Sequence, residues 1–278
     1  MAEHSTRRLF MATAAAGIGL VARVRSSPPE EQRTASSPSA ADARLVEDLV
    51  AANRILAQQG IVDTFGHVSV RSNRDPHRYL MSRSLAAEFV TADDIMEFDL
   101  DSNPAGPAGR SLYGERFIHG EIYRARPDVH AVVHSHSPSV IPFGVTGTPL
   151  RAVYAAAGFV GDGTPVFDTR TLAGRSNLLV SDPAAGRALA QALGAHGAVL
   201  MRGHGAAVVG ASLPIVVARA IYLEVNAKLQ MQAMALGHDV TFLDREEARQ
   251  MTELAEATNW SQAWDGWKRK ASSMKRSG

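Results

Sequence analysis

Val129-His130-Ala131-Val132-Val133-His134-Ser135-His136 is the stretch of sequence that most constrains the fold. Its apolar residues predict a buried strand that runs directly into a pair of histidines. Side chains two positions apart project from the same side of a strand, so His134 and His136 are expected to lie together. Two imidazoles placed in this way form half of a preorganised metal site.

A second apolar stretch, Ala198 to Met201, leads into Arg202-Gly203-His204-Gly205. The glycines that flank His204 give the backbone the freedom to aim its imidazole. Three imidazoles with an open position are typical of a catalytic rather than a structural metal site. Each histidine could instead be a hydrogen-bonded core or surface residue, and the motifs alone leave both interpretations open.

Helical and strand-like patterns are mixed along the rest of the chain. Helices are predicted over residues 42–59, 114–126 and 213–236, and another begins at Asp182-Pro183, with aspartate as the cap. Strands are predicted over residues 65–70, 79–82, 95–100 and 206–209. The mixture predicts an α/β or α+β fold, with one domain over residues 42–278.

The composition excludes several classes of function. The chain has 278 residues, of which 45% are hydrophobic and 21% charged, as in a globular protein with a sizeable core. A net charge of +1 gives no electrostatic basis for binding nucleic acid or an anionic membrane. The expected partner is a small-molecule substrate. The absence of cysteine excludes disulfides, a cysteine nucleophile and thiolate zinc ligands.

The first 41 residues differ in character from the rest. Arg7-Arg8 precedes eleven small or apolar residues, Ala12 to Ala22, and a polar stretch rich in serine and proline follows. This order predicts a signal of the twin-arginine type with a disordered linker over residues 1–41, and therefore export to the periplasm. The alternative is a disordered basic N-terminus or a wrongly chosen start codon, with a cytoplasmic protein.

Five segments, taken together, resemble the class II aldolase/adducin family. They are Phe65-Gly66-His67-Val68-Ser69, Gly114-Glu115-Arg116-Phe117-Ile118-His119, Val132-Val133-His134-Ser135-His136, Met201-Arg202-Gly203-His204-Gly205 and the long helix through Tyr222. The resemblance covers roughly residues 42–240. It implies a three-layer α/β/α domain with a central mixed sheet, in a homotetramer.

The same resemblance implies that His134, His136 and His204 bind one divalent metal ion per subunit, Zn²⁺ or Mn²⁺. It implies that Glu115 is the acid/base residue and can also ligate the metal. A carboxylate at the start of a helix is in any case favoured by the helix dipole, which is the structural alternative for Glu115.

Three segments, residues 66–71, 81–84 and 112–120, resemble one branch of the family. This branch decarboxylates hydroxylated aromatic acids and includes 3-hydroxy-2-methylpyridine-4,5-dicarboxylate decarboxylase. The phosphate-binding turn of the sugar-phosphate aldolases resembles Gly-Asn-x-Ser, but here His67 stands in place of the asparagine. We therefore expect a metal-dependent carbon–carbon lyase that decarboxylates a hydroxylated aromatic or heteroaromatic acid through a metal-stabilised enolate. The alternatives are an aldolase or epimerase acting on a sugar phosphate and, less favoured because the ligands are retained, a non-enzymatic structural role.

Several side chains are candidates for contact with the substrate. The catalytic candidates are Glu115, His67 and His119, and the substrate-binding candidates are Ser69, Arg71, Ser82, Arg83 and Tyr222. Arginine forks match carboxylates, and a histidine titrates near neutral pH. The alternatives are that the arginines are solvated, that His67 anchors its turn, that His119 orients Glu115 or packs, and that Tyr222 packs in the core.

Overall fold

Within residues 40–106, 108–172 and 177–273, which the computed structural model describes, eight strands form one sheet in the order β4-β3-β2-β1-β5-β8-β7-β6. The strands are β1 His67–Arg71, β2 Arg78–Ser82, β3 Ile95–Asp99, β4 Pro104–Ala105, β5 Ala131–Ser135, β6 Val166–Phe167, β7 Ala198–Met201 and β8 Gly205–Gly210. All neighbours are antiparallel except β6 and β7, which are parallel. The sheet is therefore mixed, as expected.

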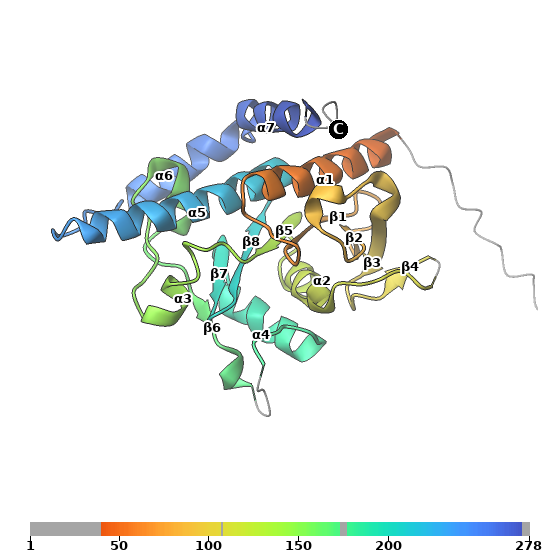
Figure 1. The fold of residues 1–278 in the computed structure, drawn as a ribbon, viewed down its shortest axis with the longest axis horizontal. Helices are drawn as coiled ribbons and strands as arrows, with labels where there is room; N and C mark the ends of the chain where they lie inside the picture. The colour runs from red at the N-terminus through yellow and green to blue at the C-terminus, as the bar shows by residue number, and fades with distance from the viewer. Residues whose placement is uncertain (1–39, 107, 173–176, 274–278) are drawn as a thin grey trace, which may run out of the picture. The chain divides into compact units, whose positions relative to one another are not determined.

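Helices cover both faces of this sheet (Figure 1). The α-helices are α1 Ala40–Gln58, α2 Phe117–Ala125, α3 Phe143–Thr146, α4 Pro183–Leu193, α5 Leu213–Ala235, α6 Arg245–Ala257 and α7 Ser261–Ser273. Short 3-10 helices are η1 Ala87–Phe89, η2 Ala92–Asp94, η3 Gly114–Arg116, η4 Ala155–Val160 and η5 Thr169–Thr171. Helices α1, α5 and α7 pack on one face and α2 and α4 on the other, which confirms the three-layer α/β/α prediction.

The alternation of side chains along β5 divides the core into two apolar layers. Ala131 and Val133 belong to the cluster that includes α1, α5 and α7, whereas Val132 belongs to the cluster with α2 and α4. All five residues of β5 are buried, because neighbouring strands flank it and helices cover both of its faces. A continuously apolar strand is what such a central position requires.

The observed elements follow the predicted ones with local differences. Asp182 caps α4 by accepting a hydrogen bond from the Ala185 N–H at 3.0 Å, as predicted. The helix predicted over residues 114–126 is broken, because Glu115 has φ −94° and ψ 18°, so that η3 precedes α2. Helices α6 and α7 were not predicted, and α6 shows why: its faces are largely charged, and its capping box joins Asp244 and Glu247.

The predicted signal and linker fall almost wholly outside the described residues, so export stays a prediction. At their boundary, α1 begins at Ala40 instead of residue 42. The described residues belong to one compact unit. No helix among the described residues is both long and apolar enough to cross a membrane.

Two strand pairings bring the predicted site residues to one edge of the sheet. In the β1–β5 pair His67 lies directly opposite His134, and β8, on the other side of β5, begins immediately after His204. Gly203 has φ +64°, which only glycine adopts without strain. A Cβ on Gly205 would lie 2.0 Å from the Ser135 carbonyl oxygen, so β8 can approach β5 only with glycine at this position.

We predict that Gly205→Ala destabilises the protein by more than about 2 kcal/mol, because the new methyl group must push β8 away from β5. Gly266→Ala in α7 is the matched control, since its Cβ meets no atom within 4 Å, and it should be neutral or stabilising by up to about 1 kcal/mol. Guanidinium unfolding of both variants checks this. Equal stability of the two variants would contradict the close packing of β8 on β5.

Candidate metal centre and substrate pocket

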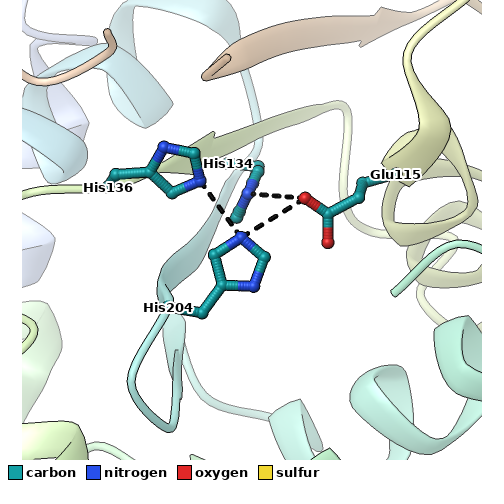
Figure 2. A group of neighbouring side chains, drawn as sticks. All are labelled: Glu115, His134, His136 and His204. Carbon is teal, nitrogen blue, oxygen red and sulfur yellow. Dashed lines mark hydrogen bonds and ion pairs between the residues drawn. The ribbon is translucent and has the colours of Figure 1, made fainter. Parts of the chain in front are cut away.

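Three histidines and one glutamate converge at the end of the central strands. His134 is the penultimate residue of β5, His136 follows two residues later, His204 lies in the turn between β7 and β8, and Glu115 lies in η3. Each offers one ligand atom, and these four atoms lie within 4.8 Å of one another. Figure 2 shows Glu115 facing the three imidazoles across a common centre. The fold thus brings together the four residues predicted to hold a metal ion.

Hydrogen bonds at the outer nitrogen of each imidazole set its orientation. Nδ1 of His134 lies 3.1 Å from the Ala206 carbonyl oxygen, and Nδ1 of His204 lies 3.0 Å from the Leu178 carbonyl oxygen. A carbonyl oxygen only accepts, so both Nδ1 atoms carry the proton. Nδ1 of His136 lies 3.0 Å from the Asp63 carboxylate and donates in the same way. When the three rings are neutral, as metal coordination requires, this arrangement leaves each Nε2 unprotonated.

The inward-facing atoms fit a divalent cation. Nε2 of His134 is buried without a hydrogen-bond partner among the described residues, 3.5 Å from Glu115 Oε2. Nε2 of His136 and Nε2 of His204 lie only 3.1 Å apart, although each would present a lone pair to the other. A cation between these atoms relieves both problems, and three imidazoles with one carboxylate are ligands that zinc and related ions accept.

Glu115 is held by both of its oxygens. Oε1 accepts the Val180 N–H at 2.8 Å, while Oε2 lies 3.3 Å from Nε2 of His204. Burial alone would raise the pKa of Glu115, but the proximity of His134 and His204 outweighs it and holds the pKa well below its usual range. The same carboxylate raises the pKa of His204 against the opposing effect of burial. Glu115 therefore presents an ionised carboxylate to the three imidazoles.

A chain of buried polar groups extends from the site into the layer between β1 and α2. Nδ1 of His67 lies 2.7 Å from Nε2 of His119, and Ser69 Oγ lies 2.5 Å from Nδ1 of His119 and 2.7 Å from the Tyr123 hydroxyl. Alternate residues of β1 face α2, which explains why His67 and Ser69 meet His119 and Tyr123. Burial lowers the pKa of His67 well below its usual value, and burial is also the main reason that the pKa of His119 is lowered to about 3.

A pocket of about 510 Å³ opens beside the metal ligands. It is lined by Glu115, His136 and His204, by His67, and by apolar or aromatic side chains, Phe65, Tyr113, Leu178 and Leu179, with Ser84 as a hydroxyl group. No arginine or lysine belongs to the part of this lining that the structure describes. His67 therefore reaches the pocket, whereas His119 lies behind His67 and is not part of the described lining.

The substrate-binding candidates lie away from this pocket, within the chain as described. Arg71 donates to the carbonyl oxygens of Val129, Pro76, Tyr123 and Arg126, so its guanidinium supports the backbone. Arg83 is paired with Asp94 at 2.6 Å. Ser69 and Ser82 are buried, and Tyr222 stacks on Trp260 with ring centroids 5.0 Å apart. Their contacts favour structural roles, and substrate binding by these five residues stays a prediction.

Sequence analysis missed two residues that support the site. Asp63 holds His136 and also accepts the N–H groups of Phe65 and Gly66 at 2.9 and 3.0 Å, a turn typical of aspartate before glycine that could have indicated its position. Burial would raise the pKa of Asp63, but the hydrogen bond with His136 and those with the backbone outweigh it and lower the pKa. Tyr123 lies four residues after His119, a helical spacing that could have placed both on one face.

We predict that Asp63→Asn weakens zinc binding by roughly 10- to 100-fold, because the charge that supports His136 is lost while the amide oxygen can still accept the two N–H groups of the turn. Competition with a chelator measures the affinity. Asp162→Asn is the control, since this exposed carboxylate pairs only with Arg245 in the described structure. Equal zinc affinity of the two variants would show that the Asp63 carboxylate does not contribute to metal binding.

We predict that His119 makes the metal-free protein acid-sensitive. The unfolded histidine binds a proton below about pH 6.5, whereas the buried one stays neutral until pH falls to about 3, so stability declines as pH falls through this window. Between pH 6.5 and 5 the loss is ~2 kcal/mol for one histidine. His119→Gln should lower the pH dependence of the unfolding free energy by this amount, measured by urea unfolding across the range. An unchanged slope would show that folded His119 titrates normally.

Comparison with known proteins agrees with this site. The family model of the class II aldolase and adducin N-terminal domain matches residues 47–231. The decarboxylase tropJ of Talaromyces stipitatus is 34% identical over 247 residues, which cover 81% of this chain and 92% of that protein. The 3,4-dihydroxyphthalate decarboxylase of Arthrobacter keyseri is 31% identical and covers 78% of this chain and 90% of that protein.

Solved structures give the same result for the fold. L-fuculose 1-phosphate aldolase from Glaciozyma antarctica superposes with a TM-score of 0.70 and 26% identity, over 90% of this chain and 95% of that chain. The family match spans most of the described chain and includes all four metal-ligand candidates. This chain is a member of the class II aldolase and adducin family.

Proposed function

We propose that this protein is a divalent-metal-dependent lyase that decarboxylates a hydroxylated aromatic or heteroaromatic carboxylic acid. The observation that carries the proposal is the pocket, in which apolar and aromatic walls stand directly beside the metal ligands. Phe65, Tyr113, Leu178 and Leu179 offer a flat ring apolar contact, while the ligand set offers a cation to its oxygens. The decarboxylases among the relatives support the same reaction class.

The reaction adds a proton to the ring carbon that bears the carboxylate and breaks the bond to that carboxylate. The electron pair of the broken bond returns to the ring as CO₂ leaves. A divalent ion held by His134, His136 and His204 supplies Lewis-acid stabilisation of negative charge that develops on the substrate's oxygen atoms. We propose that one Zn²⁺ or Mn²⁺ per subunit fills this role in a homotetramer.

The chain's own residues orient the substrate and handle the proton. Glu115 lines the pocket with Oε2 toward the imidazoles, so a proton that it takes up there lies beside the bound substrate. The Val180 N–H keeps Oε1 in place during this exchange. Leu178 and Leu179 limit the access of water to the ring face that they cover.

The alternative reaction, aldol cleavage or epimerisation of a sugar phosphate, would use the same ligands. It is supported by the structural likeness to L-fuculose 1-phosphate aldolase. A dianionic phosphate is normally held by cationic side chains or by several N–H groups. The described lining of the pocket contains no arginine or lysine, and this favours the aromatic acid.

The test uses the full chain loaded with Zn²⁺ or Mn²⁺ and a panel of ortho-hydroxylated aromatic mono- and dicarboxylates. We expect CO₂ release that EDTA abolishes and that added metal restores, because the lyase reaction depends on the ion. L-fuculose 1-phosphate and related sugar phosphates form the second arm of the panel. Turnover of the sugar phosphates alone would contradict the proposed decarboxylation and favour aldol chemistry.

Glu115→Gln should lower kcat by roughly 10²- to 10⁴-fold in samples whose metal content is measured to be intact, because the amide cannot exchange a proton. Glu253→Gln is the control, since this exposed carboxylate pairs with Arg249 on α6 and lies outside the pocket. Equal kcat for the two variants would assign the proton transfer to another group.

A further inference from the structure

The buried chain of hydrogen bonds that ends at His67 has a direction that can be worked out from its contacts. Its four members are Tyr123, Ser69, His119 and His67, of which none is more than 1% exposed. The links are 2.7 Å, 2.5 Å and 2.7 Å long, and each can run either way in isolation. The group at the Tyr123 end determines the direction in which each hydrogen bond of the chain is donated.

Tyr123 fixes the direction. Its hydroxyl group contacts Ser69 Oγ and the backbone of Val132, and the backbone contact favours the phenolate, as a donating N–H does, so that Ser69 Oγ is the acceptor for the phenol proton among the described residues. If Ser69 donated to Tyr123, the phenol proton would be buried without an acceptor, which is costly. The phenol therefore donates to Ser69.

The direction then passes along the chain. The Ser69 hydroxyl group has one proton and donates it to Nδ1 of His119. A neutral His119 with Nδ1 as acceptor carries its proton on Nε2, which donates to Nδ1 of His67. A neutral His67 with Nδ1 as acceptor carries its own proton on Nε2, and this nitrogen makes no hydrogen bond to a described side chain.

We propose that the chain Tyr123–Ser69–His119 locks His67 as the Nε2–H tautomer, so that His67 presents a hydrogen-bond donor, and not a base, to an anionic oxygen of the substrate. His67 lines the pocket beside Glu115, and its ring centroid is 5.1 Å from that of His134. Tyr123, Ser69 and His119 are positioning residues that act through His67. The tautomer rests on the contacts alone, whereas the role toward the substrate rests on the proposed function.

This arrangement complements the three metal ligands. Their rings are held with the proton on Nδ1 and the lone pair of Nε2 directed inward. His67 is held in the opposite state by a different set of partners, although its Cα lies opposite His134 in the sheet. An oxygen atom of an aromatic acid in the pocket would meet a hydrogen-bond donor on the side of His67 and a cation on the side of the three metal ligands.

The tautomer can be measured directly in the zinc-loaded full chain by long-range ¹⁵N–¹H NMR with ¹⁵N-labelled histidine, with the His67 signal assigned by its loss in His67→Gln. We expect a protonated Nε2 and an unprotonated Nδ1 at His67. In Tyr123→Phe the lock is weakened, and the Nδ1–H form should appear. Tyr79→Phe is the matched control, because its equally buried hydroxyl group bonds Ser102 instead of this chain, and it should leave the spectrum of His67 unchanged.

Binding of 2-hydroxybenzoate, followed by calorimetry, tests the donor role without turnover. His67→Leu should weaken binding about tenfold or more, whereas His67→Gln, which keeps an N–H donor, should retain affinity within about threefold. A wild-type His67 with its proton on Nδ1 would overturn the lock. If the tautomer is as expected, equal affinities of His67→Leu and His67→Gln would overturn the donor role. Absence of binding by the wild type would overturn it as well. Absence of decarboxylation with the tautomer and binding as expected would count against the proposed function alone.

Discussion

The antiparallel pairing of β5 with β1 on one side and β8 on the other is the interaction on which the site depends. Hydrogen bonds of this ladder place His67 opposite His134 and start β8 one residue after His204. The close approach of Gly205 to the Ser135 carbonyl holds the β8 side of the ladder. The reactive groups are therefore placed by regular backbone structure, which is stiffer than a set of loops would be.

Two opposite demands on histidine meet within a few ångströms. A metal ligand must offer a lone pair at Nε2, and a donor must offer a proton at the same atom. The protein separates the two by what it places behind each ring. Carbonyl or carboxylate oxygens stand behind His134, His136 and His204, while a histidine nitrogen stands behind His67. The hydrogen-bond partner behind each ring thus determines whether its Nε2 offers a lone pair or a proton.

The parts of the structure that follow from local rules could be predicted from the sequence. The metal ligands are recognised because strand alternation aligns His134 with His136, and the cap at Asp182 marks the start of α4. The direction of a long side chain depends on packing that no local pattern encodes. Arg71 looks the same in the sequence whether it reaches a substrate or, as here, four carbonyl oxygens.

The kink at Glu115 and the pocket wall at Leu178 could not be predicted from the sequence, because both depend on tertiary contacts. Residues 114–126 have a helical pattern throughout, and only the tertiary contact of Glu115 with the Val180 N–H reveals why the first turn departs from it. The segment around Leu178 has no regular secondary structure and no periodicity to read. Its position follows from the whole fold and not from its own residues.

Two residues serve both the pocket wall and the support of the metal ligands, through different atoms. Leu178 contributes its side chain to the wall and its carbonyl oxygen to His204, while Phe65 contributes its ring to the wall and its N–H to Asp63 behind His136. What Leu178 and Phe65 contribute to the support is a backbone carbonyl oxygen and a backbone N–H, which do not depend on the side chain of either residue. Evolution can exchange the wall side chains, and with them the shape of the acid that is accepted, while the catalytic ion keeps its place. Such a division allows one ancestral site to diversify across many substrates.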